Sequence, residues 1–353
     1  MIIEKSELAG ILAKVKVAMP SNPNIAALKG ILIKEDRVTA NNLEIAITAK
    51  LSTKTDTPFI LPSKAIDMIA SLPDGEIEIT TVDGGGIIKI LAAGIKNSFA
   101  ALSPNDFAEP APPDTTGEPI CISSKKLHDM VSSVLYAAST NNSRPTATGV
   151  LFDASNGKMN VVAVDGYRAA WNKTEIDGEF RFTVPRTSLE KMLKLSMSGD
   201  IKIAYGSKSA VFESDKYSVY TRLIEGNEFN YRATFPARKD QIVVNRPSLL
   251  EGINRILICD DGERKAAIIS FTGAKMKIAI ETALASYSEE IEVHGDTDEQ
   301  LRIGLNAYYM RDALKSYNAE HITMSLDTAK TPVVFSDDEL LSMLLPVRLH
   351  DGE

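Results

Sequence analysis

The sequence predicts an α+β protein built from three repeated domains. A length of 353 residues, landmarks that recur about every 120 residues, and a mixture of helix and strand patterns in each repeat lead to this prediction. A chain this long exceeds what one compact core usually holds. The expected domains are residues 1–115, 116–238 and 239–353.

The first landmark is a helix with an apolar stripe at the i, i+3, i+7 spacing of one helix face. It occurs three times, at Leu8, Ile11 and Val15, at Leu127, Met130 and Val134, and at Leu250, Ile253 and Leu257. The second landmark is a strand that leads into another helix at Pro62, Pro185 and Asn306. Proline suits this position because its missing N–H would be unpaired there. The third is a strand that ends in Leu102, Leu223 and Leu345.

Each repeat is therefore expected to contain two helices and several strands. The helices are predicted over residues 6–19, 63–72, 124–138, 186–195, 247–258 and 306–317. Hairpin turns are predicted at Gly84-Gly85-Gly86, Asn156-Gly157 and Asp260-Asp261-Gly262. The proline-rich stretch Glu109–Pro113 is the first candidate linker, and Phe235–Lys239 is the second.

The composition fits a cytoplasmic globular protein. Hydrophobic content is 44% and charged content is 24%. No run approaches the ~18 apolar residues that a membrane span needs, and the N-terminus has no export signal. The two cysteines, Cys121 and Cys259, are far apart, which argues against a disulfide scaffold or a cysteine-rich zinc site.

No constellation typical of an enzyme is visible. The four histidines have no metal-ligand spacing, and neither a phosphate-binding loop nor a nucleophile elbow is present. The acidic pairs Asp260-Asp261 and Asp337-Asp338 fit turns better than a metal site. We therefore expect no cofactor, no metal and no catalysis. Trp171, the only tryptophan, is expected to lie in the core.

Charge is distributed unevenly along the chain. The net charge is −8, yet the six predicted helices carry 11 basic and 6 acidic residues. Glutamate is also a good helix former, so helix propensity alone does not explain this excess. An acidic body with basic helices can hold a phosphate backbone on one surface and repel it elsewhere. Without aromatic platforms or base-reading motifs, such contacts would be independent of sequence. Ordinary solvated helix faces remain the alternative interpretation.

Several segments resemble the bacterial sliding clamp family, the beta subunits of DNA polymerase III. The resemblance extends over essentially the full length, and its order and spacing are more specific than any one motif. The segments that carry it are Val162–Arg168, Val184-Pro185-Arg186, Asn230-Tyr231-Arg232 before Phe235-Pro236, and Leu345–Leu349. The chain departs from the family pattern at Asn22, at Pro145 and Thr146, and in the additional residues His350–Glu353.

The resemblance implies the DNA-clamp fold, in which a head-to-tail homodimer forms a ring with helices lining the interior and sheets outside. Such a ring encircles double-stranded DNA without sequence preference and is not an enzyme. It tethers the replicative polymerase and the clamp loader through short peptide motifs with a glutamine and apolar anchors. No membrane association is implied.

Three sets of site residues follow from the resemblance and from basic character. The partner-peptide cleft is expected at Ala147, Val164, Gly166, Tyr167, Arg168, Ala169, Thr234, Pro332, Leu345, Pro346, Val347 and Arg348. The small residues Ala147 and Ala169 predict a wider pocket than the family usually has. DNA contacts are expected at Lys14, Lys125, Arg144, Arg186, Lys194, Arg255 and Arg311. The dimer interface is expected to pair Lys89, Lys96 and Phe99 with Leu257, Ile258, Glu289, Glu290 and Glu292.

Two other function classes compete with the clamp. An enzyme of nucleotide metabolism on a repeated α+β fold would need catalytic residues that the sequence lacks. A scaffold that does not bind DNA would share the repeats but would have no use for basic helices. Loss of retention on circular DNA after neutralising helix lysines separates the clamp from the scaffold.

Overall fold

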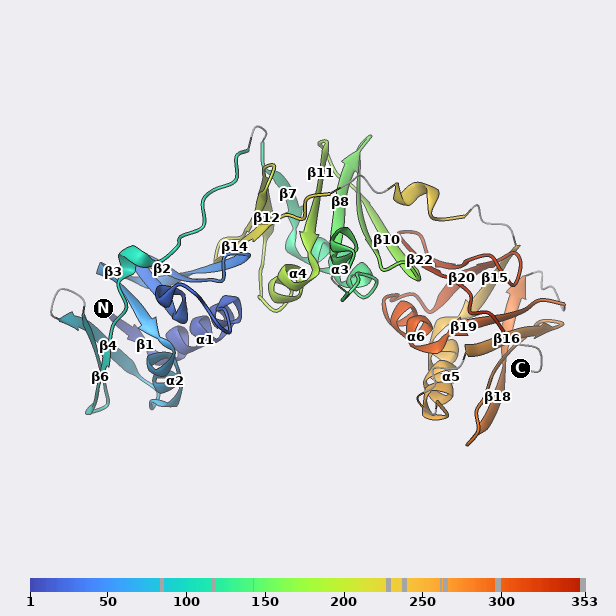
Figure 1. Cartoon of the computed structure of the whole chain (residues 1–353), viewed down its shortest axis with the longest axis horizontal. Helices are drawn as coiled ribbons and strands as arrows, with labels where there is room; N and C mark the ends of the chain where they lie inside the picture. Colours follow the sequence, from blue (N-terminus) through green and yellow to red (C-terminus); the bar gives the residue numbers. More distant parts are fainter. Residues whose placement is uncertain are drawn as a thin grey trace. The chain divides into compact units, whose positions relative to one another are not determined.

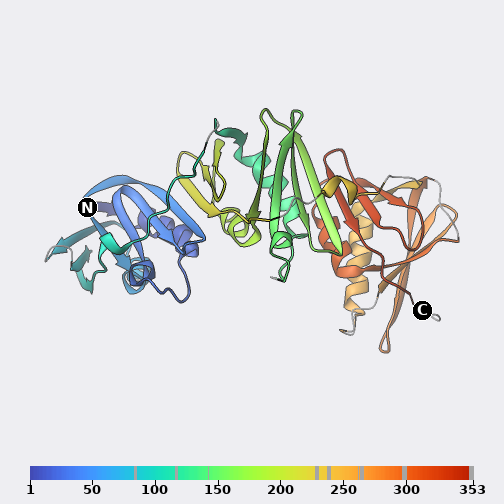
Figure 2. The same cartoon turned by 45° about the horizontal axis from the view of Figure 1, so that its top comes forward.

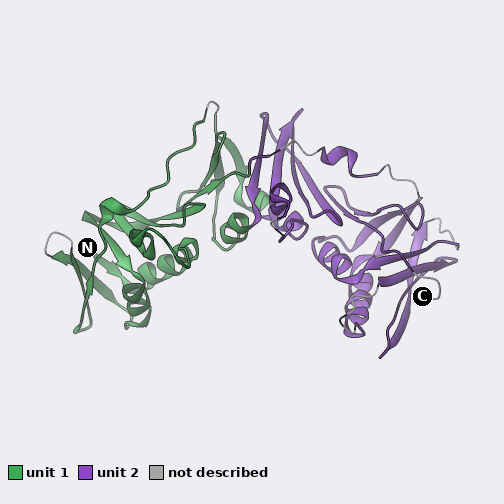
Figure 3. Cartoon of the chain, in the orientation of Figure 1, with its two compact units in different colours: residues 1–127, 187–224 green, residues 128–186, 225–353 purple. Residues whose placement is uncertain are grey.

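A computed structural model describes most of the chain (Figure 1). The described residues are 1–82, 86–115, 118–141, 143–226, 230–236, 240–260, 262, 266–295 and 300–349. They form two compact units, which Figure 3 distinguishes by colour. Unit 1 contains residues 1–127 and 187–224, and unit 2 contains residues 128–186 and 225–353. The second repeat is divided between the two units, and the three-domain division stays a prediction.

Each of the six predicted helices is present, although most are shorter than expected at their C-terminal ends. They are α1 (Lys5–Val15), α2 (Ser63–Ser71), α3 (Ser124–Leu135), α4 (Arg186–Met192), α5 (Arg246–Ile258) and α6 (Ala307–Lys315). The side chains of Asn245 and Asn306 accept hydrogen bonds from the first turns of α5 and α6, which fixes where these two helices begin. After Val15 the chain tightens into a 3₁₀ turn, so α1 ends before Met19.

Unit 1 contains two antiparallel sheets. The first has the order β1 (Ile2–Glu4), β4 (Glu76–Val82), β5 (Ile87–Ala92) and β6 (Ile95–Ala100). The second has the order β2 (Gly30–Asn41), β3 (Ile45–Pro62), β14 (Tyr217–Arg222), β13 (Ser209–Glu213), β12 (Asp200–Tyr205) and β7 (Ile120–Ser123). Because β3 belongs to the first repeat and β14 to the second, this sheet runs from one repeat into the next.

Unit 2 contains one 12-stranded sheet. It runs β11 (Phe180–Pro185), β8 (Gly149–Ser155), β9 (Lys158–Val164), β10 (Arg168–Glu175), β22 (Leu340–Leu344), β21 (Val333–Ser336) and β20 (His321–Leu326), and continues through β15 (Asp240–Asn245), β18 (Ser286–Gly295), β17 (Lys275–Glu281), β16 (Ala266–Thr272) and β19 (Arg302–Asn306). Here β10 of the second repeat pairs with β22 of the third.

The helices cover the sheets with the apolar stripes that the sequence predicted. In unit 1, α1 contacts α2, β2 and β3, and Leu8, Ile11 and Val15 are almost completely buried. In unit 2, α5 contacts α6, β17 and β18, as Figure 2 also shows. Strands such as β4 and β17 alternate buried and exposed residues, as expected for a sheet with one face in the core.

The predicted turns have different outcomes. Asn156 and Gly157 join β8 to β9 with positive φ values of 54° and 73°, which is the hairpin geometry that an Asn-Gly pair favours. The hairpin predicted at Asp260-Asp261-Gly262 is wrong, because Asp260 follows the end of α5 and not a strand. Gly84, Gly85 and Asp261 lie outside the described residues. No described helix is long and apolar enough to cross a membrane.

Candidate partner-peptide site

The bend predicted at Asp165-Gly166 is a tight turn between β9 and β10. Oδ1 of Asp165 accepts hydrogen bonds from the backbone N–H groups of Tyr167 (2.8 Å) and Arg168 (3.0 Å). Gly166 has a backbone φ of +96°, a value that residues other than glycine rarely adopt, so the turn requires glycine here. Tyr167 at the tip is 64% exposed. The turn therefore presents backbone and one aromatic side chain to solvent.

The C-terminal segment lies beside this turn. The N–H of Leu345 donates to the carbonyl of Tyr167 (2.9 Å), and the N–H of Val347 donates to the carbonyl of Gly304 (2.8 Å). The side chains of Leu345 and Val347 remain 37% and 38% exposed, so Val347 is not strand core. These backbone bonds bring together residues 165–168 and 345–347, two segments that the sequence analysis nominated for one site.

An apolar cluster lies under these segments. It contains the buried residues Ala169, Val334, Leu341 and Met343, with the partly buried Val164 and Phe235 packed against it. Val164 and Ala169 belong to the predicted site, whereas Val334, Leu341, Met343 and Phe235 were not among the predicted site residues. Phe235 could have been assigned to the site, because Phe235-Pro236 is one of the segments that carry the family resemblance. For the other three, the sequence predicts only that they lie in buried strands.

Ala169 and Ala147, whose small size predicts a wider pocket, are both buried, and the pocket width stays a prediction. Ala169 has 0% exposure because Val334 and Met343 pack around it in the cluster. Ala147 is only 9% exposed.

The segment that carries Phe235 is fixed to unit 2 by a buried carboxylate. Oδ2 of Asp153 accepts a hydrogen bond from the hydroxyl of Tyr231 (2.7 Å) and forms an ion pair with Arg232 (3.2 Å). Burial, together with the hydrogen bond to Asp153, raises the pKa of Tyr231. Trp171 is half-buried and its ring lies 5.5 Å from that of Phe235, so it borders the site and is not simply a core residue.

The remaining predicted peptide-site residues are accessible to different degrees. Thr234, Pro332 and Pro346 are half-buried, and Arg348 is exposed. Arg168 is not a free donor at the rim, because its side chain is 12% exposed and forms ion pairs with Asp165 and Asp312. Arg144, which we assigned to DNA, instead lies beside the turn: a Cβ placed on Gly166 would be 3.3 Å from its Nη1.

The other predicted DNA contacts separate into two groups. Lys14 of α1 and Lys194 after α4 lie together within unit 1, and Nζ of Lys14 donates to the carbonyl of Lys194 (2.9 Å). Lys194 and Lys125 are exposed, whereas Lys14 is half-buried. The arginines have local partners instead: the guanidinium of Arg186 donates to the carbonyl of Ala138, that of Arg255 to the carboxylate of Glu289, and that of Arg311 to the carboxylate of Asp312.

The predicted interface residues lie on two sheet edges and one helix end. Lys89 of β5 and Lys96 of β6 are exposed, and Phe99 of β6 is half-buried. In unit 2, Ile258 at the end of α5 is 82% exposed, whereas Leu257 is half-buried. Glu289, Glu290 and Glu292 lie on β18, where Glu290 forms an ion pair with Lys275 (2.9 Å). No group of metal-ligating side chains occurs among the described residues.

Repeated α+β units whose sheets continue from one repeat into the next define a protein of the DNA-clamp class. Residues 121–229 match the family "DNA polymerase III beta subunit, central domain", and residues 232–347 match "DNA polymerase III beta subunit, C-terminal domain". The chain belongs to the family of DNA polymerase III beta subunits, the sliding clamps.

Individual relatives agree with this assignment. The chain is 25% identical to the "Beta sliding clamp" of Synechocystis sp. over 99% of each chain, and 24% identical to that of Streptococcus pneumoniae over 81% of this chain and 78% of the relative. The beta subunit of Streptococcus pyogenes DNA polymerase has the same fold, with a TM-score of 0.91 at 21% identity over 99% of both chains. A Pseudomonas aeruginosa sliding clamp gives 0.89 at 20% identity, also over 99% of both.

These findings confirm the predicted family, fold and general function. The family consists of non-catalytic processivity factors, so the chain is a DNA sliding clamp and not an enzyme.

Proposed function

We propose that two copies of this chain close head to tail around duplex DNA in the cytoplasm, and that the ring tethers a polymerase and the clamp loader by their short peptides. The supporting observation is that strand pairing joins neighbouring repeats at two places in the chain, here called joints, and leaves a third equivalent joint unmade. β3 of the first repeat pairs with β14 of the second, and β10 of the second pairs with β22 of the third. A third equivalent joint requires β18 of one copy and β6 of another. The repeats correspond to the expected domains, residues 1–115, 116–238 and 239–353.

The two strands in question have unpaired edges. Within the described part of the chain, β6 pairs with β5 alone. β18 pairs with β17 over residues 286–292, but with β15 only at residues 293–295. An exposed edge offers unpaired N–H and C=O groups to other strands, and proteins normally cover it. An antiparallel contact between these edges would cover both, and rotational closure would limit the assembly to a ring.

The existing joints also give the register of the proposed one. If residues equivalent to those of the β10–β22 joint face each other, Ala285 lies opposite Phe99 and Ser288 lies opposite Lys96. Glu290 is then the diagonal neighbour of Lys96, which is exposed, and long side chains can reach an opposite charge at a diagonal position. Nδ2 of Asn97 is buried without a hydrogen-bond partner in the single chain, and the carboxylate of Glu289, its diagonal neighbour, is the candidate acceptor.

Two exposed apolar side chains support the same contact. Leu284, which the sequence analysis did not assign to the interface, is 85% exposed, and Ile258 is 82% exposed. The hydroxyl of Thr282 donates to the carbonyl of Cys259 (3.3 Å), which holds the β17–β18 turn against the end of α5 near both side chains. Burying each apolar side chain in a dimer contributes roughly 1.5–3 kcal/mol.

Charge reversal tests the dimer and its register. Lys96→Glu alone, or Glu290→Lys alone, is expected to weaken the dimer because like charges then occupy diagonally neighbouring positions across the joint. The double variant restores an opposite pair and should recover the dimer. Sedimentation equilibrium measures the mass, with Lys54→Glu on β3 as a matched control. A double variant no more dimeric than either single variant would exclude this register, and fully dimeric single variants would exclude this pair from the interface.

DNA contact is expected to depend on charge and not on base sequence. Lys14 and Lys194 are the leading candidates, because they are adjacent and Lys194 is exposed, whereas Arg255 and Arg311 are engaged with carboxylates. Replacing both lysines with alanine should lower the log–log salt slope by about one unit for each phosphate that is no longer neutralised. Retention on nicked circular but not on linear DNA is the accompanying assay. Equal retention on both forms would contradict encirclement.

Peptide binding is expected where the Asp165–Arg168 turn meets the C-terminal segment. Small apolar side chains over the apolar cluster suit the apolar anchors of a partner peptide, and the exposed backbone of Gly166 permits close approach. Val347→Trp adds bulk to a side chain that is 38% exposed, so the fold tolerates it while the site is blocked. Peptide affinity should be lost and the dimer kept. Affinity within twofold of the unaltered protein would place the site elsewhere.

A further inference from the structure

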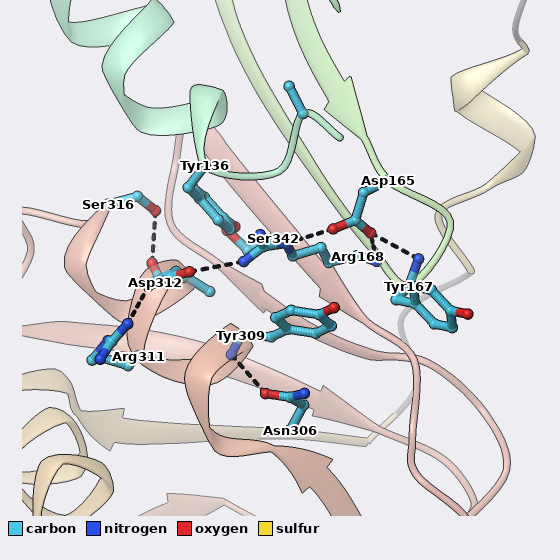
Figure 4. A network of polar contacts seen from close by, with 12 residues as sticks. Tyr136, Asp165, Tyr167, Arg168, Asn306, Tyr309, Arg311, Asp312, Ser316 and Ser342 are labelled. Carbon is cyan, nitrogen blue, oxygen red and sulfur yellow. Dashed lines mark hydrogen bonds and ion pairs between the residues drawn. The ribbon is translucent and has the colours of Figure 1, made fainter. Parts of the chain in front are cut away.

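Arg168 ties the Asp165–Arg168 turn to helix α6, as Figure 4 shows. Its Nε donates to Oδ2 of Asp165 (2.8 Å), and its Nη1 donates to Oδ2 of Asp312 (2.9 Å). The Arg168 side chain is 12% exposed and that of Asp312 is 29% exposed. Two carboxylates therefore compensate one largely buried guanidinium, and one of them comes from a helix outside the predicted peptide site.

Aromatic rings fix the plane of the guanidinium. Cζ of Arg168 lies 4.3 Å from the ring centre of Tyr309 and 5.4 Å from that of Tyr136. The hydroxyl of Tyr136 in turn donates to Oγ of Ser342 on β22 (2.9 Å). Burial by itself lowers the pKa of Arg168, but hydrogen bonds to Asp312 and Asp165 outweigh it and raise this pKa. A planar, permanently charged group that bridges two carboxylates is a role that lysine does not reproduce.

The network reaches the accessible surface through the turn. Asp165 uses Oδ1 to hold the N–H groups of Tyr167 and Arg168, and Oδ2 to hold the Arg168 side chain. The carbonyl of Tyr167 accepts from the N–H of Leu345. The position of the guanidinium is thus coupled, through Asp165, to the turn and to the first residue of the C-terminal segment.

We propose that Asp312 is a positioning residue for the partner-peptide site: it holds Arg168, and through it the turn, in the arrangement that a peptide binds. This inference rests on the proposed peptide-binding function. Without the Asp312 carboxylate, Arg168 keeps only Asp165 as an ion-pair partner among the described residues, and its guanidinium is free to turn toward water. The turn then samples other arrangements, and a peptide must select the competent fraction, which weakens its apparent affinity.

The direction of the effect distinguishes this role from direct contact. If Arg168 itself donated hydrogen bonds to the peptide, removing the charge of Asp312 would free donors and strengthen binding. If Arg168 is held for positioning, the same substitution weakens binding although residue 312 touches no peptide.

The experiment uses the full-length dimer and a fluorescently labelled synthetic peptide with one glutamine and two apolar anchors. Fluorescence anisotropy gives its affinity for the unaltered protein, Asp312→Asn, Asp312→Glu and Glu320→Gln. We expect Asp312→Asn to weaken binding about tenfold. Asp312→Glu, which keeps the carboxylate, should restore part of the affinity. Glu320→Gln, an exposed carboxylate with the same change of charge, should stay within twofold.

A double-substitution cycle with Arg168→Lys supplies a readout that general destabilisation would not change. If Asp312 acts through Arg168, Asp312→Asn lowers the peptide affinity of the Arg168→Lys variant by less than twofold. If the two residues act independently, their affinity losses multiply. The thermal unfolding midpoint and the dimer mass of each variant are measured alongside. The positioning role would be overturned if the two affinity losses multiply in the double variant. It would also be overturned if the affinity loss merely follows the unfolding midpoint.

The outcomes separate this inference from the function on which it rests. If the unaltered protein does not bind the peptide, the proposed peptide-binding function fails. If the unaltered protein binds, Val347→Trp does not, and Asp312→Asn binds normally, only the positioning role of Asp312 is overturned. Tighter binding by Asp312→Asn would identify Arg168 as a direct contact instead.

Discussion

Replacing Asp153 with alanine should destabilise unit 2, because this carboxylate connects three side chains. The Asp153 side chain is 8% exposed and accepts from the hydroxyl of Tyr231 at 2.7 Å. Ion pairs with Arg181 (3.1 Å) and Arg232 (3.2 Å) complete its surroundings. The substitution therefore removes a buried acceptor and two charge pairs at once.

The expected loss follows from the exposure of each partner. A buried hydroxyl left without its acceptor costs about 1–3 kcal/mol. The side chains of Arg181 and Arg232 are 31% and 49% exposed, so solvent screens both pairs and each adds only about 0–1 kcal/mol. Together these contributions predict a decrease of about 1–5 kcal/mol in the free energy of unfolding.

Urea unfolding followed by circular dichroism measures this decrease. Asp177→Ala serves as the control, because Asp177 is an exposed carboxylate between β10 and β11 in the same unit. Emission from Trp171, whose ring lies 5.0 Å from that of Tyr231, reports whether the transition includes this region. If Asp153→Ala costs no more than the control, the buried hydrogen bond does not stabilise the unit as argued.

Three further predictions address backbone geometry, pH and binding. Gly295→Ala should cost about 2 kcal/mol or more, because φ is +126° and the new Cβ would lie 2.5 Å from a backbone carbonyl oxygen. Gly273→Ala, with φ at +56° and no atom within 4 Å, should cost only about 1 kcal/mol in the same unfolding assay. Burial raises the pKa of Glu289, but hydrogen bonds from Tyr287 and Arg255 outweigh it, so this pKa lies below its ordinary value of 4.5. The stabilisation is therefore present above pH 4.5 and disappears as the pH falls through the lowered pKa, and Arg255→Met should flatten the acid side of a stability–pH profile. Peptide binding should change the emission of Trp171, and a response that persists in Trp171→Phe would have to come from another group.

Local patterns were sufficient to predict the helices and the repeat. A stripe such as Leu8, Ile11 and Val15 reports which face of one segment is buried, and that face is buried here. The bend at Asp165-Gly166 was equally predictable, because a short carboxylate and a glycine determine the turn by themselves. The failed hairpin at Asp260 shows the limit, since a turn signal does not say whether a helix or a strand precedes it.

The family resemblance brought the two principal segments of the candidate site to notice, but the packing between them depended on tertiary structure. Phe235 and Met343 meet Ala169 in one cluster although they are distant in sequence. A strand pattern shows that such residues are buried without showing what covers them. The small size of Ala169 was evident from the sequence, whereas the neighbouring strands that pack against it were not.

The period, the helix positions and the family could be predicted from the sequence, because these depend on spacing along the chain. Which charged side chains are available for binding depends on the folded structure. Arg168 and Asp312 are 144 positions apart and form an ion pair, while Lys14 and Lys194 are 180 positions apart and lie side by side with Lys194 exposed. The partner of a charged side chain is set by strand register and helix packing over such distances, and a sequence pattern does not encode that distance in space.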